Sequence, residues 1–164
     1  MAIRRILRKD DNALYKVCRP VVKFDRRLEE LLNDMADTMY QAEGVGLAAS
    51  QVGILRRAVV IDCGDGLLEL INPEILEATG EEGDMEGCLS FPGESGYVVR
   101  AACVKVRAQD RFGVWYECEG EGLLARALQH ELDHLDGRVY VDLVSEPPPE
   151  FLKEMERLEQ EAEE

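Results

Sequence analysis

The sequence predicts an α+β fold in which antiparallel or mixed β-sheets pack around a central helix, with one helix before the sheets and a helical tail after them. Two observations predict this class. Apolar residues recur at helical spacing in two regions, and the region between them consists of short β-prone runs separated by turn residues. A length of 164 residues suits one domain with one hydrophobic core. We therefore expect one folded domain over residues 1–146 and a separate tail over residues 147–164.

The first helix is expected to begin after Asp25, because an aspartate side chain can accept hydrogen bonds from the free N–H groups of a first helical turn. Gly44 and Gly46 follow shortly after its predicted end, as stop signals should. The apolar residues that recur at helical spacing are Leu28, Leu31, Leu32, Met35 and Met39.

The middle of the chain, from about residue 57 to residue 119, is predicted to form the sheets. Its short runs are rich in Val, Ile, Leu and Tyr, and glycine, proline or asparagine separates them. Turn residues at these positions favour hairpins and meanders over crossover connections through helices. The sequence therefore predicts antiparallel or mixed strands here.

Helical spacing returns between Gly122 and Gly137, which predicts the central helix. The later run from Glu146 to Pro149 contains three prolines and can continue neither a helix nor a central strand. Residues 151–164 again show a helical pattern, but with few apolar residues. We expect them to form a weakly docked terminal helix.

Acidic residues dominate the composition, with 34 Asp and Glu against 19 Lys and Arg and a net charge of −15. Such a surface repels phosphate backbones, so we expect no DNA partner. No apolar run approaches the ~20 residues of a membrane-spanning helix, and the first residues lack the apolar core of a signal peptide. Five scattered cysteines without a CxxC pair fit reduced thiols. We therefore expect a cytoplasmic protein that binds no membrane.

The chain has only two histidines, His130 and His134, and they lie four residues apart in the predicted central helix. Residues at this spacing share one helix face, so both imidazoles can bind one metal ion while Glu131 carries a proton beside it. A solvated helix face is the alternative, but the helix is otherwise apolar. Gln129 and Asp133 are placed to hold the outer ring nitrogens. The central helix is therefore predicted to be a metal-binding HExxH helix.

A catalytic metal of this type needs a third protein ligand. The metzincin pattern HExxHxxGxxH is followed as far as Gly137, but Tyr140 stands where its last histidine should be. A downstream glutamate, as in thermolysin-like peptidases, could come only from the tail. Cys88 is the one cysteine in a turn-rich segment, where Gly87 permits close approach of the backbone to a ligand. We predict Cys88 as the third ligand. Two other functions remain as alternatives: a zinc peptidase that uses the same glutamate, and a structural or redox-sensing module in which Cys88 and the histidines hold a closed metal site.

Three segments resemble the signature motifs of the peptide deformylase family: GVGLAASQ at 44–51, EGCLS at 86–90 and QHELDH at 129–134. The likeness spans about residues 1–145 and excludes the tail. It implies a bacterial, cytoplasmic enzyme that removes the formyl group from N-formyl-methionyl nascent chains and releases formate near the ribosome. It also implies Fe(II) as the physiological metal, although this donor set would also accept Zn(II), Ni(II) or Co(II) in purified protein.

The resemblance also implies roles for individual residues. Glu131 transfers the proton, and the side-chain amide of Gln51 and the backbone N–H of Leu89 stabilise the formyl oxygen as it becomes negative. Glu86 is expected beside the ligands, with Arg100 as its ion partner. The residues expected to contact the substrate are Val45, Gly46, Gly87, Leu123, Arg126 and Ala127.

Two of these expectations stay open at the level of the sequence. Arg126 either meets the peptide at the rim of its pocket or pairs with a surface acid. The tail from Glu146 to Glu164 holds eight acidic and two basic residues, so direct contact with ribosomal RNA is not expected. We expect a monomer.

Overall fold

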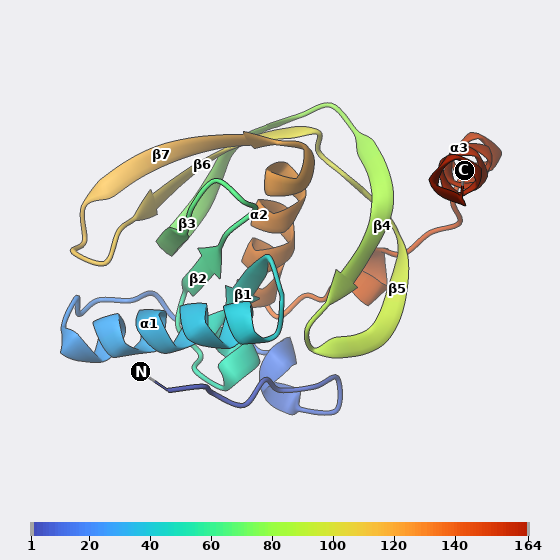
Figure 1. Ribbon diagram of the computed structural model, residues 1–164. Helices are drawn as coiled ribbons and strands as arrows, with labels where there is room; N and C mark the ends of the chain where they lie inside the picture. Colours follow the sequence, from blue (N-terminus) through green and yellow to red (C-terminus); the bar gives the residue numbers. More distant parts are fainter. Residues whose placement is uncertain (1, 164) are drawn as a thin grey trace.

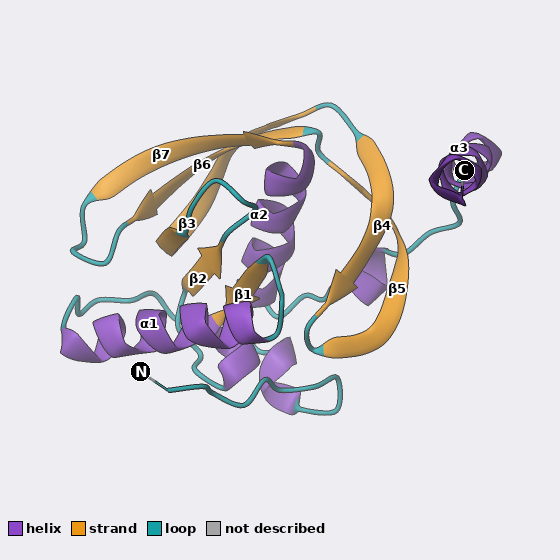
Figure 2. Ribbon diagram, in the orientation of Figure 1, coloured by secondary structure: helices purple, strands orange, loops and turns teal. Residues whose placement is uncertain are grey.

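The computed structural model describes residues 2–163 and, within them, forms a five-stranded sheet, a two-stranded sheet and three α-helices, as Figures 1 and 2 show. The helices are α1 (Arg26–Gln41), α2 (Gly122–Leu135) and α3 (Pro149–Glu163). The strands are β1 (Gly46–Ala48), β2 (Ala58–Ile61), β3 (Leu68–Thr79), β4 (Glu82–Cys88), β5 (Phe91–Arg100), β6 (Cys103–Gln109) and β7 (Trp115–Glu121). Three short 3₁₀ turns cover Asn12–Tyr15, Ala49–Val52 and Tyr140–Leu143. The predicted α+β class is confirmed.

The named strands all pair in antiparallel fashion, which falls within the predicted antiparallel or mixed arrangement. The larger sheet has the order β1-β2-β3-β6-β7, and β4 pairs only with β5. Figure 2 shows α2 between the larger sheet and the β4–β5 hairpin. Residues carried by α2 can therefore meet residues carried by either sheet.

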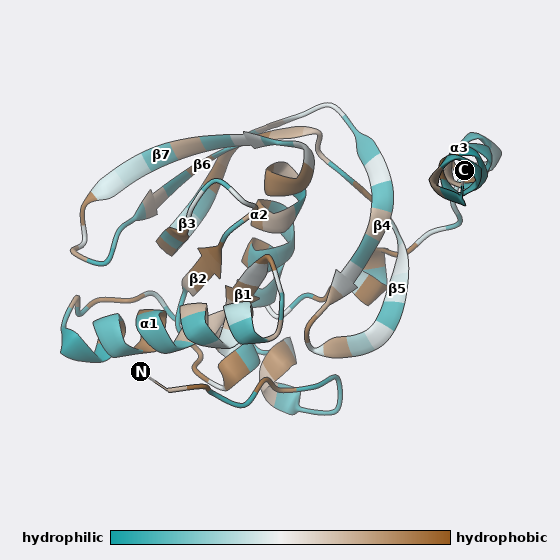
Figure 3. Cartoon of the chain, viewed as in Figure 1, coloured by the Kyte–Doolittle hydropathy of each residue, from teal (hydrophilic) through white to brown (hydrophobic). Residues whose placement is uncertain are grey.

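Strand β2 explains why both faces of the larger sheet are covered. Val59 and Ile61 belong to one core cluster with Leu128 and Leu132 of α2. The alternate residues Ala58 and Val60 belong to a second cluster with the apolar face of α1. Successive side chains of a strand point to opposite faces, so a strand that is apolar throughout needs a helix on each side. Figure 3 shows β2 as a hydrophobic strand between the two helices.

Helix α1 begins where the sequence predicts. Asp25 accepts a hydrogen bond from the backbone N–H of Leu28 at 3.2 Å, which caps the helix. The chain after the helix turns sharply, with Glu43 at a φ of 58° and the N–H of Gly44 bonded to the carbonyl of Met39. This turn delivers the glycine segment directly to β1, at the edge of the larger sheet.

Two strands depart from the sequence-based expectation. The segment around Cys88 was expected to be turn-rich, yet residues 82–88 form β4. Its Gly83 serves packing, because a Cβ there would overlap the ring of Tyr97 on β5. Gly46 likewise begins β1. Glycine usually indicates a turn, but in both strands it admits a neighbouring side chain.

Helix α3 projects from the rest of the structure, as Figure 1 shows. None of its residues is buried, and its Phe151 packs against Tyr97 with ring centroids 4.8 Å apart. The predicted helical tail is therefore present. Among residues 2–163, no helix combines the length and the apolar character that crossing a membrane requires.

Candidate active site

Helix α2 brings His130, Glu131 and His134 together inside the structure. All three side chains are buried, and the two imidazole centroids lie 5.0 Å apart. This proximity follows from the helical repeat alone, since residues four apart share a face. The apolar residues of α2 face the core of the larger sheet and hold the helix in place.

Cys88 comes from the end of β4 and completes a cluster of three metal-binding side chains. Its Sγ lies 3.3 Å from His134 Nε2, and the ligand atoms of Cys88, His130 and His134 all lie within 4.8 Å of one another. A tetrahedral metal with bonds of about 2.0–2.3 Å holds its nitrogen and sulfur ligands roughly 3.3–3.7 Å apart, so the spacing suits one ion. A thiolate with two imidazoles is also a donor set typical of zinc and iron. The residues present therefore fit a divalent metal.

The tail contributes no ligand to this cluster. Among the residues that the structure describes, Cys88, His130 and His134 form the one group with such spacing, and the glutamates of α3 are not part of it. A thermolysin-like arrangement with a downstream glutamate is thus absent from the described chain.

Glu86 of β4 orients the first imidazole. Its Oε1 lies 2.5 Å from His130 Nδ1, which leaves Nε2 of that ring free for the metal cluster. The expectation that Gln129 and Asp133 would hold the ring nitrogens was wrong. Gln129 binds the backbone N–H and carbonyl of Ala101, and Asp133 accepts from Arg100 at 2.8 Å.

Two arginines surround Glu86. Arg100, at the end of β5, donates to Oε1 at 2.6 Å and to Oε2 at 3.0 Å, and Arg126 of α2 donates to Oε2 at 2.9 Å. Burial alone would raise the pKa of Glu86, but the hydrogen bonds from His130 and Arg100 outweigh it and hold that pKa well below its usual range. Glu86 is therefore an anion that accepts from three side chains.

Charges around the cluster favour a bound cation. Burial lowers the pKa of His134 to about 3, so its imidazole is neutral, as a metal ligand must be. Burial also opposes a charge on His130, yet the negative groups of Glu131, Cys88 and Glu86 raise the pKa of His130 to about 10. Surroundings that attract a proton so strongly also attract a metal ion.

Glu131 is buried at the inner end of the site, and its Oε1 has no hydrogen-bond partner among the described residues. Burial raises the pKa of Glu131 to about 7. Gly46 makes room for this carboxylate, because a Cβ at Gly46 would lie 2.5 Å from Glu131 Oε2. A carboxylate with a free oxygen and a pKa near neutrality suits proton transfer.

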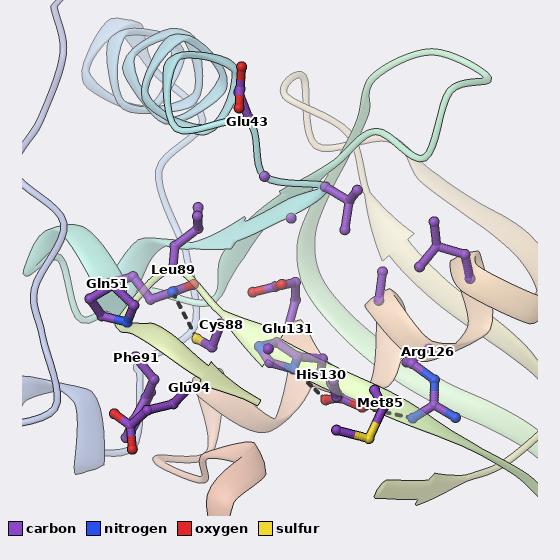
Figure 4. Close-up of a pocket in the computed structure, with 18 of the residues that line it drawn as sticks. Glu43, Gln51, Met85, Cys88, Leu89, Phe91, Glu94, Arg126, His130 and Glu131 are labelled. Carbon is purple, nitrogen blue, oxygen red and sulfur yellow. Dashed lines mark hydrogen bonds and ion pairs between the residues drawn. The ribbon is translucent and has the colours of Figure 1, made fainter. Parts of the chain in front are cut away.

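A cavity of about 460 Å³ opens onto the metal cluster, as Figure 4 shows. Every residue predicted to contact the substrate lines it: Val45, Gly46, Gly87, Leu123, Arg126 and Ala127. Several other lining residues were not predicted from the sequence: Glu43, Met85, Phe91, Pro92, Gly93 and Glu94. Most of these belong to the β4–β5 hairpin, which was not expected as a continuous pair of strands.

The carboxamide of Gln51 has a defined orientation. Its Oε1 accepts from the N–H of Ala48 at 2.9 Å, and its Nε2 donates to Ser90 Oγ at 3.1 Å and lies 3.5 Å from Cys88 Sγ. Because the oxygen is occupied by a backbone donor, the NH₂ group must face Cys88. Ser90 was not predicted as a site residue, although it lies in the segment EGCLS.

The chain is similar to known proteins over most of its length. The family described as polypeptide deformylase matches residues 3–149. A peptide deformylase of Caldicellulosiruptor bescii is 57% identical over 144 residues, which are 88% of this chain and 87% of that relative. A peptide deformylase of Alkaliphilus metalliredigens is 56% identical over 144 residues, 88% of this chain and 98% of that relative. The crystal structure of peptide deformylase from Thermotoga maritima aligns with a TM-score of 0.86 at 45% identity, covering 88% of this chain and 99% of that one.

Proposed function

The chain belongs to the peptide deformylase family, and we propose that its Cys88, His130 and His134 hold the metal ion on which the reaction of that family depends. It is an enzyme that removes the N-terminal formyl group from newly made polypeptides. The observation that carries the metal assignment is the meeting of three ligand atoms within 4.8 Å beside the buried Glu131.

The proposed chemistry divides between the metal and the side chains. When bound, a divalent ion supplies a Lewis acid that makes water nucleophilic near neutral pH. Glu131 takes a proton from the water that attacks the formyl carbon and returns it to the amine as the carbon–nitrogen bond breaks. The products are formate and a free amino terminus.

Gln51 and Leu89 are proposed to stabilise the negative charge that develops on the formyl oxygen. The amide of Gln51 is held with its NH₂ group toward Cys88, and Leu89 is the residue after Cys88 in the chain, so both donors lie at one end of the cavity. A fixed donor of this kind is worth about 2.7–4 kcal/mol in the transition state.

The peptide is proposed to bind between β1 and β4. Strand β1 is the edge of the larger sheet and pairs only with β2, and β4 pairs only with β5, so each has one side without a neighbouring strand. Val45 and Gly46 at one edge and Gly87 at the other can hydrogen-bond an extended peptide as an added strand. Leu123 and Ala127 of α2 line the part of the cavity proposed for the first side chain.

The finer attributes of the enzyme are proposals as well. We infer Fe(II) as the physiological metal, with oxidation of the iron or of Cys88 as its weakness, and Zn(II), Ni(II) or Co(II) as ions that purified protein can hold. We place the enzyme in the cytoplasm beside the ribosome, as a monomer. Residues 1–146 form the proposed catalytic domain, and residues 147–164 form an acidic tail. The described part of that tail, residues 147–163, adds nothing to the cavity lining.

Formate release from formyl-Met-Ala-Ser tests the proposal. Protein purified without oxygen and loaded with Fe(II) or Ni(II) should release formate and should leave an unformylated peptide intact. Glu131→Gln should lose activity by about 100-fold or more while it still binds metal. Inactive wild-type protein, or a Glu131→Gln variant with most of the activity, would contradict the mechanism.

A further inference from the structure

The β4–β5 hairpin carries Cys88, but within residues 2–163 it shares no strand pairing with the larger sheet. His130 and His134 lie on α2, which packs mainly on that larger sheet. The distance from the cysteine to the histidines therefore depends in part on side-chain contacts between the hairpin and α2, in addition to the packing of the hairpin against Val139 and Tyr140.

Arg126 makes three of these contacts from a single guanidinium group. Its Nη1 donates to Glu86 Oε2 at 2.9 Å and to the carbonyl of Val98 at 3.0 Å, and its Nη2 donates to the carbonyl of Glu82 at 2.8 Å. Glu82 and Glu86 belong to β4, and Val98 belongs to β5. One side chain of α2 thus binds both strands of the hairpin.

The donors of Arg126 are directed into the protein. The residue is 8% exposed, and its acid partner is the buried Glu86 and not a surface acid. In Figure 4, Arg126 lies beside His130, at the opposite end of the cavity from Gln51. Three of the five N–H donors of this guanidinium thus bind groups of the protein itself, which favours a structural role over contact with a peptide.

We propose that Arg126 is a positioning residue that acts through Glu86, a role that rests on the proposed binding of a metal by Cys88 and the histidines. It holds the carboxylate against His130 Nδ1 and holds the hairpin against α2, and so it keeps Cys88 and His130 at the spacing that one metal ion requires. Without it, one oxygen of Glu86 loses a donor, and two backbone carbonyls inside the hairpin lose theirs. Groups that orient metal ligands in this way typically change metal affinity by about 10–100-fold.

The test measures metal release from Co(II)-loaded protein after a chelator is added, followed by the thiolate-to-cobalt absorption band. Arg126→Met keeps most of the apolar stem and removes every donor. Arg57→Met is the matched control. Arg57 donates to the carbonyl of Leu135, the last residue of α2, at 3.2 Å and to Asp136 Oδ1 at 3.0 Å, but it makes no hydrogen bond to Glu86. Arg126→Lys restores the charge with fewer points of contact.

Arg126→Met should release cobalt about tenfold faster than wild type or more, with a shifted absorption band. Arg126→Lys should release cobalt at a rate between those of Arg126→Met and wild type. Arg57→Met should release cobalt as slowly as wild type, even if its thermal midpoint falls. In metal-saturated assays, Arg126→Met should lower kcat and leave KM within about threefold.

Equal rates of cobalt release from the Arg126→Met and Arg57→Met proteins would overturn the proposal, because Arg126 would then only help α2 to pack against the hairpin. A raised KM with unchanged release would also overturn it and make Arg126 a substrate contact. If Arg126→Met does not fold, the comparison of Arg126→Lys with Arg57→Met decides in the same way. Cobalt release is read without substrate, so failure of wild-type protein to release formate would refute the proposed function separately.

Discussion

The Oε1 atom of Glu86 lies 2.5 Å from Nδ1 of His130, so a carboxylate on β4 orients an imidazole on α2. The same carboxylate binds Arg100 and Arg126. One side chain thus joins the hairpin to the helix and turns the remaining nitrogen of His130 toward the metal cluster.

Glu86→Gln should weaken metal binding by about 10–100-fold, because the ring of His130 loses its anionic partner. It should also destabilise the fold by about 3–5 kcal/mol, since the buried Arg126 loses its carboxylate partner and Arg100 keeps only Asp133. Metal affinity by competition with a chelator and unfolding in urea measure the two effects. The control is Glu69→Gln, which breaks an ion pair with Arg111 away from the site. Equal metal affinity in both variants would contradict the role of Glu86.

Gly46→Ala should reduce kcat by tenfold or more while the metal stays bound. A Cβ at Gly46 would lie 2.5 Å from Glu131 Oε2, so the proton-transfer group must move. A displacement of about 1 Å can cost about 100-fold in rate. Gly96→Ala is the control, because a Cβ there would crowd Val144, outside the cavity. It should lower stability and keep kcat, and a similar kcat loss in both variants would rule out a specific effect on Glu131.

Ser90→Ala should lower kcat less than Gln51→Ala does. Ser90 Oγ accepts from Gln51 Nε2 at 3.1 Å, but the N–H of Ala48 still fixes the other end of the amide. Loss of one neutral hydrogen bond is worth about 0.5–1.5 kcal/mol, which predicts a decrease of roughly tenfold at most. Thr38→Val removes a comparable buried hydroxyl, one that accepts from the N–H of Arg4, and should leave kcat unchanged. Steady-state kinetics at saturating metal decide between these outcomes.

Asp34 should make stability depend on pH at the acidic end. A hydrogen bond from the N–H of Ala2, together with Arg4, lowers the pKa of Asp34 below its usual 3.8 despite partial burial. Because the folded-state pKa is depressed, this stabilisation is present above the unfolded-state value and is lost as pH falls through the folded-state value. The difference in unfolding free energy between wild type and Asp34→Asn should therefore shrink below about pH 4. A difference that stays constant from about pH 6 to about pH 2 would refute this assignment.

Removal of residues 147–164 should leave kcat/KM within about twofold. Helix α3 has no buried residue and contributes none to the cavity, and its Phe151 packs against Tyr97. A small decrease in the thermal midpoint is expected, because Tyr97 loses that aromatic neighbour. Formate release and a melting curve of the shortened chain check both points, and a large loss of activity would assign the tail a catalytic role.

Those parts of the site that lie within one element could be predicted from the amino-acid order. His130, Glu131 and His134 meet because the helical repeat places residues four apart on one face, whatever the rest of the fold does. The helix after Asp25 was predictable for the same local reason. The three motifs also pointed to the family that the comparisons show, and they located Cys88 and Gln51.

The family resemblance placed Glu86 beside the ligands and paired it with Arg100, as the structure shows, but the other contacts that hold the ligands in place became known only from the packing of the folded chain. Gln129 and Asp133 are neighbours of the histidines in the sequence, but their side chains bind Ala101 and Arg100. The partner of His130 is Glu86, 44 residues away in the sequence. Spacing along a helix follows from local backbone geometry. A contact between α2 and the β4–β5 hairpin depends on how two separately formed elements pack, which no local pattern in either one specifies.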